Sequence, residues 1–148
     1  MSKPKAEGQW GRCTCLRLRK LTRRVTQMYD QALAPAGLTS SQFSLLAFLS
    51  VRGDTSIGAL ADELLMDPTS LTRTLRPLEK RRLLKVAVAR DDRRRRDVAV
   101  TEAGRTAFRE ALPRWRKVQA DLADLMGSPR FDELNRSLDD SLRQLTAS

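Results

Sequence analysis

The sequence contains no histidine, and this absence removes many common catalytic chemistries. A histidine general base, a Ser-His-Asp triad, a Cys-His pair and a histidine-ligated metal are all excluded. The two cysteines, Cys13 and Cys15, cannot form a structural zinc site alone, because such a site takes four ligands. The seven glycines are scattered, so there is no glycine-rich phosphate loop. We therefore expect no enzyme activity, no cofactor and no metal.

Long hydrophobic runs are missing as well. The longest apolar stretch is only a few residues, whereas a membrane span needs roughly 20. The lysines near the N-terminus are not followed by the hydrophobic segment and cleavage site of a secretory signal. We expect a cytoplasmic protein without a membrane partner. Its 148 residues, 41% of them hydrophobic, are enough for one folded core.

Positive charge is what the sequence has in excess, with 28 Lys and Arg against 18 Asp and Glu, a net charge of +10. The excess is local, because residues 73–96 hold eleven basic side chains and three acids, whereas residues 102–148 hold eight of each. A second basic stretch, residues 3–24, could flank the same partner or only solubilise a helix. The concentrated patch predicts a polyanionic partner.

Hydrophobic periodicity predicts a mainly α chain with the order α-α-α-α-β-β-α-α. Polar residues 1–9 form an expected flexible tail, and apolar residues spaced by three and four then predict a helix ending near Pro35. The later helices are expected to begin at polar caps. These caps are Thr39 with Gln42, Thr55 or Ser56, Asp67, Thr101 and Ser128. Pro77 lies within the fourth helical pattern and predicts a kink or an early change of direction there.

A two-residue period replaces the helical one between residues 84 and 100. Val86 and Val88, then Val98 and Val100, alternate with other residues and predict a β-hairpin with a long charged tip at residues 90–96. Two short helices followed by a basic hairpin predict a winged helix-turn-helix over residues 38–101. The terminal segments, residues 10–37 and 102–148, carry apolar stripes, and the pattern offers no further domain against which these stripes could be buried. We expect these stripes to form the dimerisation region of a homodimer.

The second short helix would read the major groove of double-stranded DNA. Hydroxyls can contact base edges or phosphates, and an arginine paired with guanine is the commonest specific contact. The candidate residues are Thr69, Ser70, Thr72, Arg73 and Arg76. An ordinary amphipathic helix with a solvated polar face is the alternative.

The hairpin tip would enter the neighbouring minor groove, whose negative potential attracts arginine. Its candidates are Arg93, Arg94, Arg95 and Arg96, and Asp92 is expected to orient one of them. A solvated loop is the alternative.

The residues around this tip resemble the MarR family of transcriptional regulators. The segment Asp92-Arg93-Arg94 with Val98, Val100-Thr101 and Gly104 is similar to the family's wing signature D-R-R-x-x-x-V-x-L-T-x-x-G, with Val100 in place of the usual Leu. Residues 37–43, 71–73 and 78–83 are similar to the opening of the family's second helix and to its reading helix. At Arg82 a glycine would be commoner. The resemblance runs from about residue 12 to the end.

This resemblance implies a triangular homodimer that binds a pseudo-palindromic operator and usually represses. It also implies that Asp92 pairs with Arg94, and that Arg93 or Arg95 enters the minor groove. Release would follow from a small phenolic or aromatic ligand or from thiol oxidation. A ligand could lie between the dimer helices and the reading lobe. The candidate lining residues are Trp10, Tyr29, Phe43, Phe48 and Trp115.

Thiol oxidation is the alternative trigger. Cys15 and Tyr29 are similar in position to the reactive cysteine and one of two tyrosines in the peroxide-sensing OhrR branch, but Arg19 stands where the other tyrosine would be. Nearby arginines would favour the thiolate. Two ordinary cysteines without a redox role are the competing interpretation.

A basic scaffold that binds nucleic acid without sequence preference is an alternative of another class. Only 5% of the residues are aromatic and none lies in the basic segment to stack on bases, which favours the regulator. The sequence thus predicts a cytoplasmic, nucleoid-associated DNA-binding regulator.

Overall fold

A computed structural model describes residues 12–147 of the protein. The helices are α2 (Thr14–Leu33), the short 3-10 helix η1 (Ala34–Ala36), α3 (Ser40–Arg52), α4 (Ile57–Glu63), α5 (Pro68–Lys80), α6 (Glu102–Met126) and α7 (Ser128–Thr146). The strands are β1 (Thr55–Ser56), β2 (Leu84–Val88) and β3 (Arg96–Val100). The predicted mainly α winged helix-turn-helix is confirmed.

Most helix starts follow from a side-chain cap. Thr39 accepts a hydrogen bond from the main-chain N–H of Gln42, whose side chain accepts from the N–H of Thr39, so the predicted capping box is present. The side chains of Ser56, Asp67 and Thr101 cap α4, α5 and α6 by accepting a hydrogen bond from the main-chain N–H three residues later. The predicted cap at Ser128 is wrong. Ser128 is already inside α7, because the preceding Gly127 takes the cap position without a side chain to contribute.

The fourth helix contains the predicted internal proline. Pro77 lies inside α5, and the helix continues past it to Lys80. The side chains of Leu71, Leu75 and Leu78 are buried on one side of this helix, and their packing holds it across the missing hydrogen bond.

The strands form a three-stranded antiparallel sheet in the order β1-β3-β2. Strands β2 and β3 are the predicted hairpin, with Leu84 opposite Val100 and Val88 opposite Arg96. Strand β1 is an addition to the predicted order, and it pairs Thr55 with Val98 and Ser56 with Asp97. It connects the wing directly to the start of α4.

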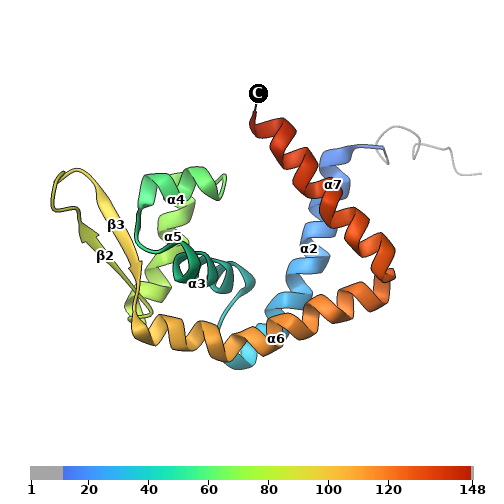
Figure 1. Ribbon diagram of the computed structural model, residues 1–148, viewed down its shortest axis with the longest axis horizontal. Helices are drawn as coiled ribbons and strands as arrows, with labels where there is room; N and C mark the ends of the chain where they lie inside the picture. The colour runs from blue at the N-terminus through green and yellow to red at the C-terminus, as the bar shows by residue number, and fades with distance from the viewer. Residues whose placement is uncertain (1–11, 148) are drawn as a thin grey trace, which may run out of the picture.

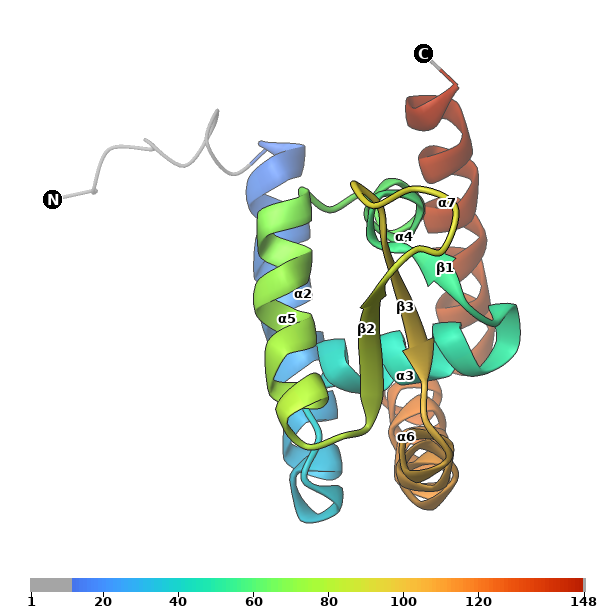
Figure 2. The ribbon, with the colours of Figure 1, turned by 90° about the vertical axis from the view of Figure 1, so that its left-hand side faces the viewer.

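One hydrophobic core holds the winged lobe together. Its side chains come from α3, α4, α5, the sheet and the first half of α6, and they include Leu46, Leu49, Leu60, Leu71, Leu78 and Val98, all fully buried. This core fixes the wing relative to α5. In Figure 2 the N-terminal end of α5 and the tip of the wing lie at the same end of the lobe.

The half of the molecule that holds α2, the end of α6 and α7 leaves apolar side chains exposed to solvent. Figure 1 shows α6 running from the winged lobe along the base to α7, with α2 crossing α6. Within the part of α7 that the structure describes no residue is buried, and Leu138, Leu142 and Leu145 are exposed. Leu16, Leu18 and Leu21 of α2 are exposed too.

No single helix among residues 12–147 is long and apolar enough to cross a membrane. Residues 14–36 and 40–52 pass that test only as a pair, by length and composition, and they are bent by 74° relative to each other.

Candidate nucleic-acid interface

The N-terminal half of α5 presents most of the predicted major-groove residues together. A surface groove is lined by Pro68, Thr69, Thr72, Arg73 and Arg76. The side chains of Thr69, Arg73 and Arg76 are exposed, whereas Ser70 is half-buried and does not line this groove. An exposed helix N-terminus with hydroxyls and guanidinium groups suits the phosphates and base edges of a duplex.

The hydroxyls of Ser70 and Thr72 on this helix already have local partners. Ser70 donates its hydroxyl to Asp67 at 2.5 Å, and Thr72 donates to the main-chain carbonyl of Pro68 at 2.8 Å. Both oxygens keep lone pairs, so these residues can still accept hydrogen bonds. The hydroxyl and then the main-chain N–H of Ser70 hold the pKa of Asp67 below its ordinary value.

The tip of the wing is closed by main-chain hydrogen bonds. The N–H of Ala89 donates to the carbonyl of Arg95 at 2.9 Å, and the N–H of Arg95 donates to the carbonyl of Asp92 at 3.0 Å. The carboxylate of Asp92 accepts from the main-chain N–H of Arg94 at 2.9 Å. The loop between β2 and β3 is therefore built as an ordered turn with Asp92 as its internal acceptor.

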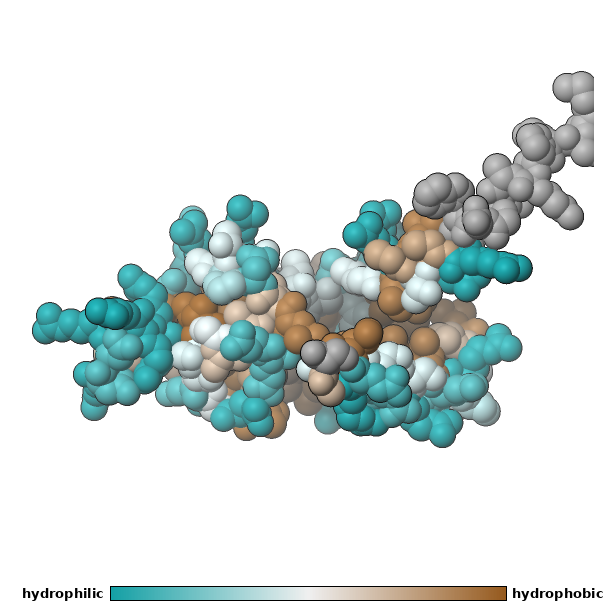
Figure 3. Space-filling model, turned by 90° about the horizontal axis from the view of Figure 1, so that it is seen from above, coloured by the Kyte–Doolittle hydropathy of each residue, from teal (hydrophilic) through white to brown (hydrophobic). Residues whose placement is uncertain are grey.

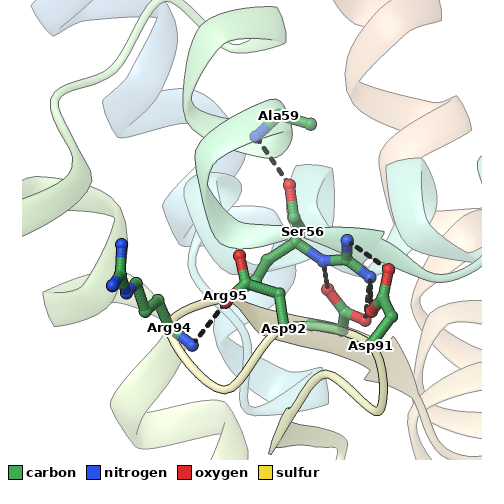
Figure 4. Close-up of polar contacts among 7 residues, drawn as sticks. Ser56, Ala59, Asp91, Asp92, Arg94 and Arg95 are labelled. Atoms are coloured by element: carbon green, nitrogen blue, oxygen red, sulfur yellow. Dashed lines mark hydrogen bonds and ion pairs between the residues drawn. The ribbon is translucent and has the colours of Figure 1, made fainter.

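The arginine held by carboxylates is Arg95, and this differs from the pairing that the resemblance implied. Its guanidinium contacts Asp91 at 2.8 and 3.1 Å and Asp97 at 2.9 and 3.3 Å. Asp92 contacts Arg94 only at its main-chain N–H, and the Arg94 side chain points away from the cluster (Figure 4). The predicted Asp92–Arg94 side-chain pair is thus replaced by an Asp91–Arg95–Asp97 cluster.

The remaining arginines of the wing are exposed. Arg90, Arg93, Arg94 and Arg96 have no side-chain hydrogen bond or ion pair to the residues that the structure describes. By contrast, the hydrogen bonds to Asp97 and Asp91 raise the pKa of Arg95 above its ordinary value. The N–H of Asp91 itself and then the Arg95 guanidinium lower the pKa of Asp91. Four positive side chains therefore remain available at the tip.

The two halves of the molecule differ in the polarity of their surfaces. In Figure 3 hydrophilic side chains cover the end that carries the wing, whereas hydrophobic side chains are open on the half with α2 and α7. An apolar groove in that half is lined mainly by α2, the end of α6 and α7, including Leu18, Leu21, Val25, Leu122, Phe131 and Leu138. This groove contains part of the apolar stripes that the sequence analysis assigned to dimerisation.

The redox candidates are placed far apart within one chain. Cys13 and Cys15 are exposed free thiols at the start of α2, so they are not packed in the core. Tyr29 lies fourteen residues after Cys15 on the same helix, about 21 Å along its axis at 1.5 Å per residue. Tyr29 is half-buried beside the apolar groove, and burial raises its pKa. A hydrogen bond between Cys15 and Tyr29 of the same chain is excluded by this distance.

The aromatic candidates do not come together around one cavity. The ring of Phe43 is buried and lies 6.0 Å from the ring of Trp115, stacked on it, and 5.3 Å from that of Phe108. Phe48 is half-buried, with the guanidinium of Arg52 5.8 Å from its ring centre. Tyr29 lies in the separate apolar groove. Trp10 lies outside the described residues.

Three features of the interface were missed in the sequence. These are β1, the role of Asp91 and Asp97, and the part that Phe108 plays in the aromatic cluster. The acids could have been recognised from their position, because an acid inside a strongly basic loop needs a local partner. No signal identified β1, since two residues show no period. Among residues 12–147 no group of three Cys, Asp or Glu side chains is placed to hold a metal.

A family model described as the MarR family matches residues 36–95. A curated relative, the uncharacterized HTH-type transcriptional regulator YhbI of Bacillus subtilis, is 28% identical over 127 residues, which cover 86% of this chain and 82% of YhbI.

Solved structures are similar over nearly the whole chain. The transcriptional regulator MosR of M. tuberculosis, in complex with DNA, is 32% identical with a TM-score of 0.80, covering 91% of this chain and 97% of MosR. The transcriptional repressor CouR, bound to a 23-mer DNA duplex, is 25% identical with a TM-score of 0.82, covering 95% of this chain and 99% of CouR.

Proposed function

Because the chain belongs to the MarR family of transcriptional regulators, we propose that it binds a pseudo-palindromic operator in double-stranded DNA as a homodimer and represses transcription. The observation that carries the proposal is the common placement of the α5 groove and the wing tip at one end of the lobe. A helix in the major groove and a wing in the next minor groove need this arrangement. The site of action is then the nucleoid in the cytoplasm.

The roles of the two elements differ. Thr69, Thr72, Arg73 and Arg76 line the groove on α5 and are assigned to the major groove, with Ser70 supporting the helix start through Asp67. Arg93, Arg94 and Arg96 of the wing are assigned to the minor groove and its phosphates. Arginine-rich tips favour narrow minor grooves because the negative potential is strongest there.

The dimer is supported by the apolar surface of the terminal helices. Residues 12–37 and 102–147 include α2, α6 and α7, whose apolar groove faces solvent in a single chain. Leu125, Leu142 and Leu145 are 75%, 51% and 78% exposed, which is a large hydrophobic surface for one helical region. A second copy of the same helices would cover it and would place two reading helices on two half-sites.

A footprint on the DNA upstream of the gene and its neighbours tests the function. The expected result is one protected palindrome, bound about 10³-fold or more tightly than random duplex, with affinity that falls steeply with salt. Salt dependence without any preferred sequence would contradict the proposal and support a non-specific scaffold. Gel filtration with light scattering should give twice the mass of the chain, and a monomer would contradict the dimer.

Two variants separate the assigned roles. Arg73→Ala should reduce discrimination at one base pair by about 10- to 100-fold, because a bidentate contact to a base is worth about 1–3 kcal/mol. Arg94→Ala should weaken binding to every duplex alike. Equal losses on all sequences for both variants would contradict the assignment.

Two triggers for release of the protein from DNA are compatible with this function. These are the binding of a small aromatic ligand and the oxidation of a thiol. The exposure of Cys15 supports access by an oxidant, and the groove beside Tyr29 offers apolar surface to a ligand. The footprint is repeated with an organic hydroperoxide and with a series of aromatic acids. Cys15→Ser should then bind DNA normally but resist the hydroperoxide. If that variant is released as readily as the wild type, the thiol trigger is wrong.

A further inference from the structure

The Arg95 guanidinium lies between two carboxylates that belong to different parts of the wing. Asp91 is in the loop, three residues after the end of β2 at Val88, whereas Asp97 is within β3. Figure 4 shows the guanidinium beside the carboxylate of Asp91. Ser56 of β1 lines the same surface pocket as Arg95 and Asp97. Because Ser56 is also the register partner of Asp97, the cluster stands where the wing loop meets β1.

Nearly all the hydrogen-bonding capacity of Arg95 is used in this cluster. Its Nε donates to Asp97, its Nη1 to Asp91, and its Nη2 to both acids. A guanidinium has five N–H groups, so one remains for any other acceptor. A bidentate contact with a phosphate or a base would require one of these carboxylates to be released.

The cluster is also electrostatically unsuited to a phosphate contact. One guanidinium and two carboxylates sum to a single negative charge. A DNA phosphate approaching Arg95 would meet this net negative group, whereas one approaching Arg93 or Arg94 would meet a side chain without such a counter-charge. Arg95 is therefore neutralised by neighbouring carboxylates, whereas Arg93 and Arg94 are not.

We propose that Arg95 is a positioning residue that locks the wing loop onto the sheet, and that it is not one of the arginines that contact DNA. The effect of this lock on DNA binding rests on the proposed function, whereas the lock itself rests only on the contacts of Arg95. With the loop closed by Arg95, the N–H of Ala89 and the turn at Asp92, the side chains of Arg93 and Arg94 are held at the tip. Through Asp97 and β1 the same cluster fixes the tip relative to α4 and α5.

Salt dependence distinguishes a locking arginine from a contacting one. Each phosphate contact contributes about 0.9 to the slope of log K against log salt. We expect Arg93→Gln, the matched control on the same loop, to lower that slope by about 0.9 on a random 30-base-pair duplex. Arg95→Gln should leave the slope unchanged while weakening binding by several-fold through a looser loop. The double variant Asp91→Asn with Asp97→Asn releases Arg95 and should steepen the slope.

Hydrogen exchange in the free protein tests the lock without DNA. The Ala89 and Arg95 amides should exchange faster in Arg95→Gln and in the double variant than in the wild type, and at the wild-type rate in Arg93→Gln. If the wild type shows no salt-dependent duplex binding, the proposed function fails, and the exchange result alone still decides the lock. Unchanged exchange in Arg95→Gln, or a slope lowered as much as by Arg93→Gln, would overturn the inference.

Discussion

The guanidinium of Arg81 donates a hydrogen bond of 2.6 Å to the main-chain carbonyl of Gly37. Arg81 is the residue at the C-terminal end of α5, and Gly37 ends η1 in the turn between α2 and α3. Residues forty-four positions apart are thereby joined, and the end of α5 is attached to the turn that follows α2. This contact is one route by which a change in the terminal helices could alter the position of α5.

Removal of the Arg81 side chain should therefore cost a measurable amount of stability. We expect Arg81→Ala to lower the free energy of unfolding by about 0.5–1.5 kcal/mol, because a charged donor to a carbonyl is lost at a solvent-exposed position. Urea unfolding followed by circular dichroism measures this. The neighbouring exposed Lys80 provides the control, and Lys80→Ala should change stability by less than about 0.5 kcal/mol. Equal effects of the two substitutions would contradict a specific role for the contact.

Arg82 occupies a backbone conformation that favours glycine, with φ of 58°. It follows the cap of α5, its N–H donates to Glu79, and the N–H of Leu83 donates to Leu78, which is the usual helix-ending motif with glycine at this position. Arg82→Gly should therefore raise the free energy of unfolding by about 0.5–1 kcal/mol, since relief of strain exceeds the added flexibility of the unfolded chain.

Arg82→Ala is the matched control, because it removes the same side chain and keeps the strain. Its urea midpoint should stay close to that of the wild type while the midpoint of Arg82→Gly rises. If both variants shift the midpoint in the same direction and by the same amount, the side chain rather than the backbone governs this position.

Local signals made much of this fold predictable, and particular residues show why. Thr39, Asp67 and Thr101 act within three residues of themselves, so their caps could be read directly from the sequence. The hairpin was predictable because Val86 and Val98 fall in a two-residue period. Arg82 could be flagged as a place for glycine from family resemblance, and the positive φ supplies the physical reason.

The contacts that were missed depend on the folded conformation of the chain and not on residue spacing alone. Asp97 and Asp91 are only two and four residues from Arg95, and the conformation of the wing brings these two carboxylates, and not that of Asp92, onto the guanidinium. The pairing of Phe43 with Phe108 requires α3 to lie on α6. Cys15 and Tyr29 are likewise separated by fourteen residues of the same helix, although the resemblance to the peroxide-sensing branch pairs them.

The cap of α5 should make stability depend on pH. The Ser70 hydroxyl and N–H lower the pKa of Asp67 in the folded state, so the carboxylate stabilises the fold. This contribution is fully present above the pKa of the unfolded chain, about 3.9, and is lost as the pH falls through the lower folded value. We expect the stability difference between the wild type and Asp67→Asn to shrink between about pH 5 and pH 2. A difference that is constant with pH in urea titrations would contradict the assignment.

Two glycines should respond in opposite ways to the same added methyl group. A Cβ on Gly104 would lie 1.9 Å from the carbonyl oxygen of Leu83 and 2.8 Å from a methyl of Val100, so α6 would have to move away from the sheet. Gly104→Ala should thus cost at least about 1–3 kcal/mol of unfolding free energy, as overpacking of a close contact does. Because α6 joins the winged lobe to α7, DNA binding should weaken as well.

Gly58, near the start of α4, has open space where its Cβ would lie and no positive φ. Gly58→Ala should therefore stabilise the protein by about 0.5 kcal/mol, because alanine restricts the unfolded chain and suits a helix. Thermal and urea unfolding of the two single variants measure the contrast. A similar loss in both would indicate that α4 tolerates no side chain at this position, whereas a neutral Gly104→Ala would show that α6 can shift from Leu83 without cost.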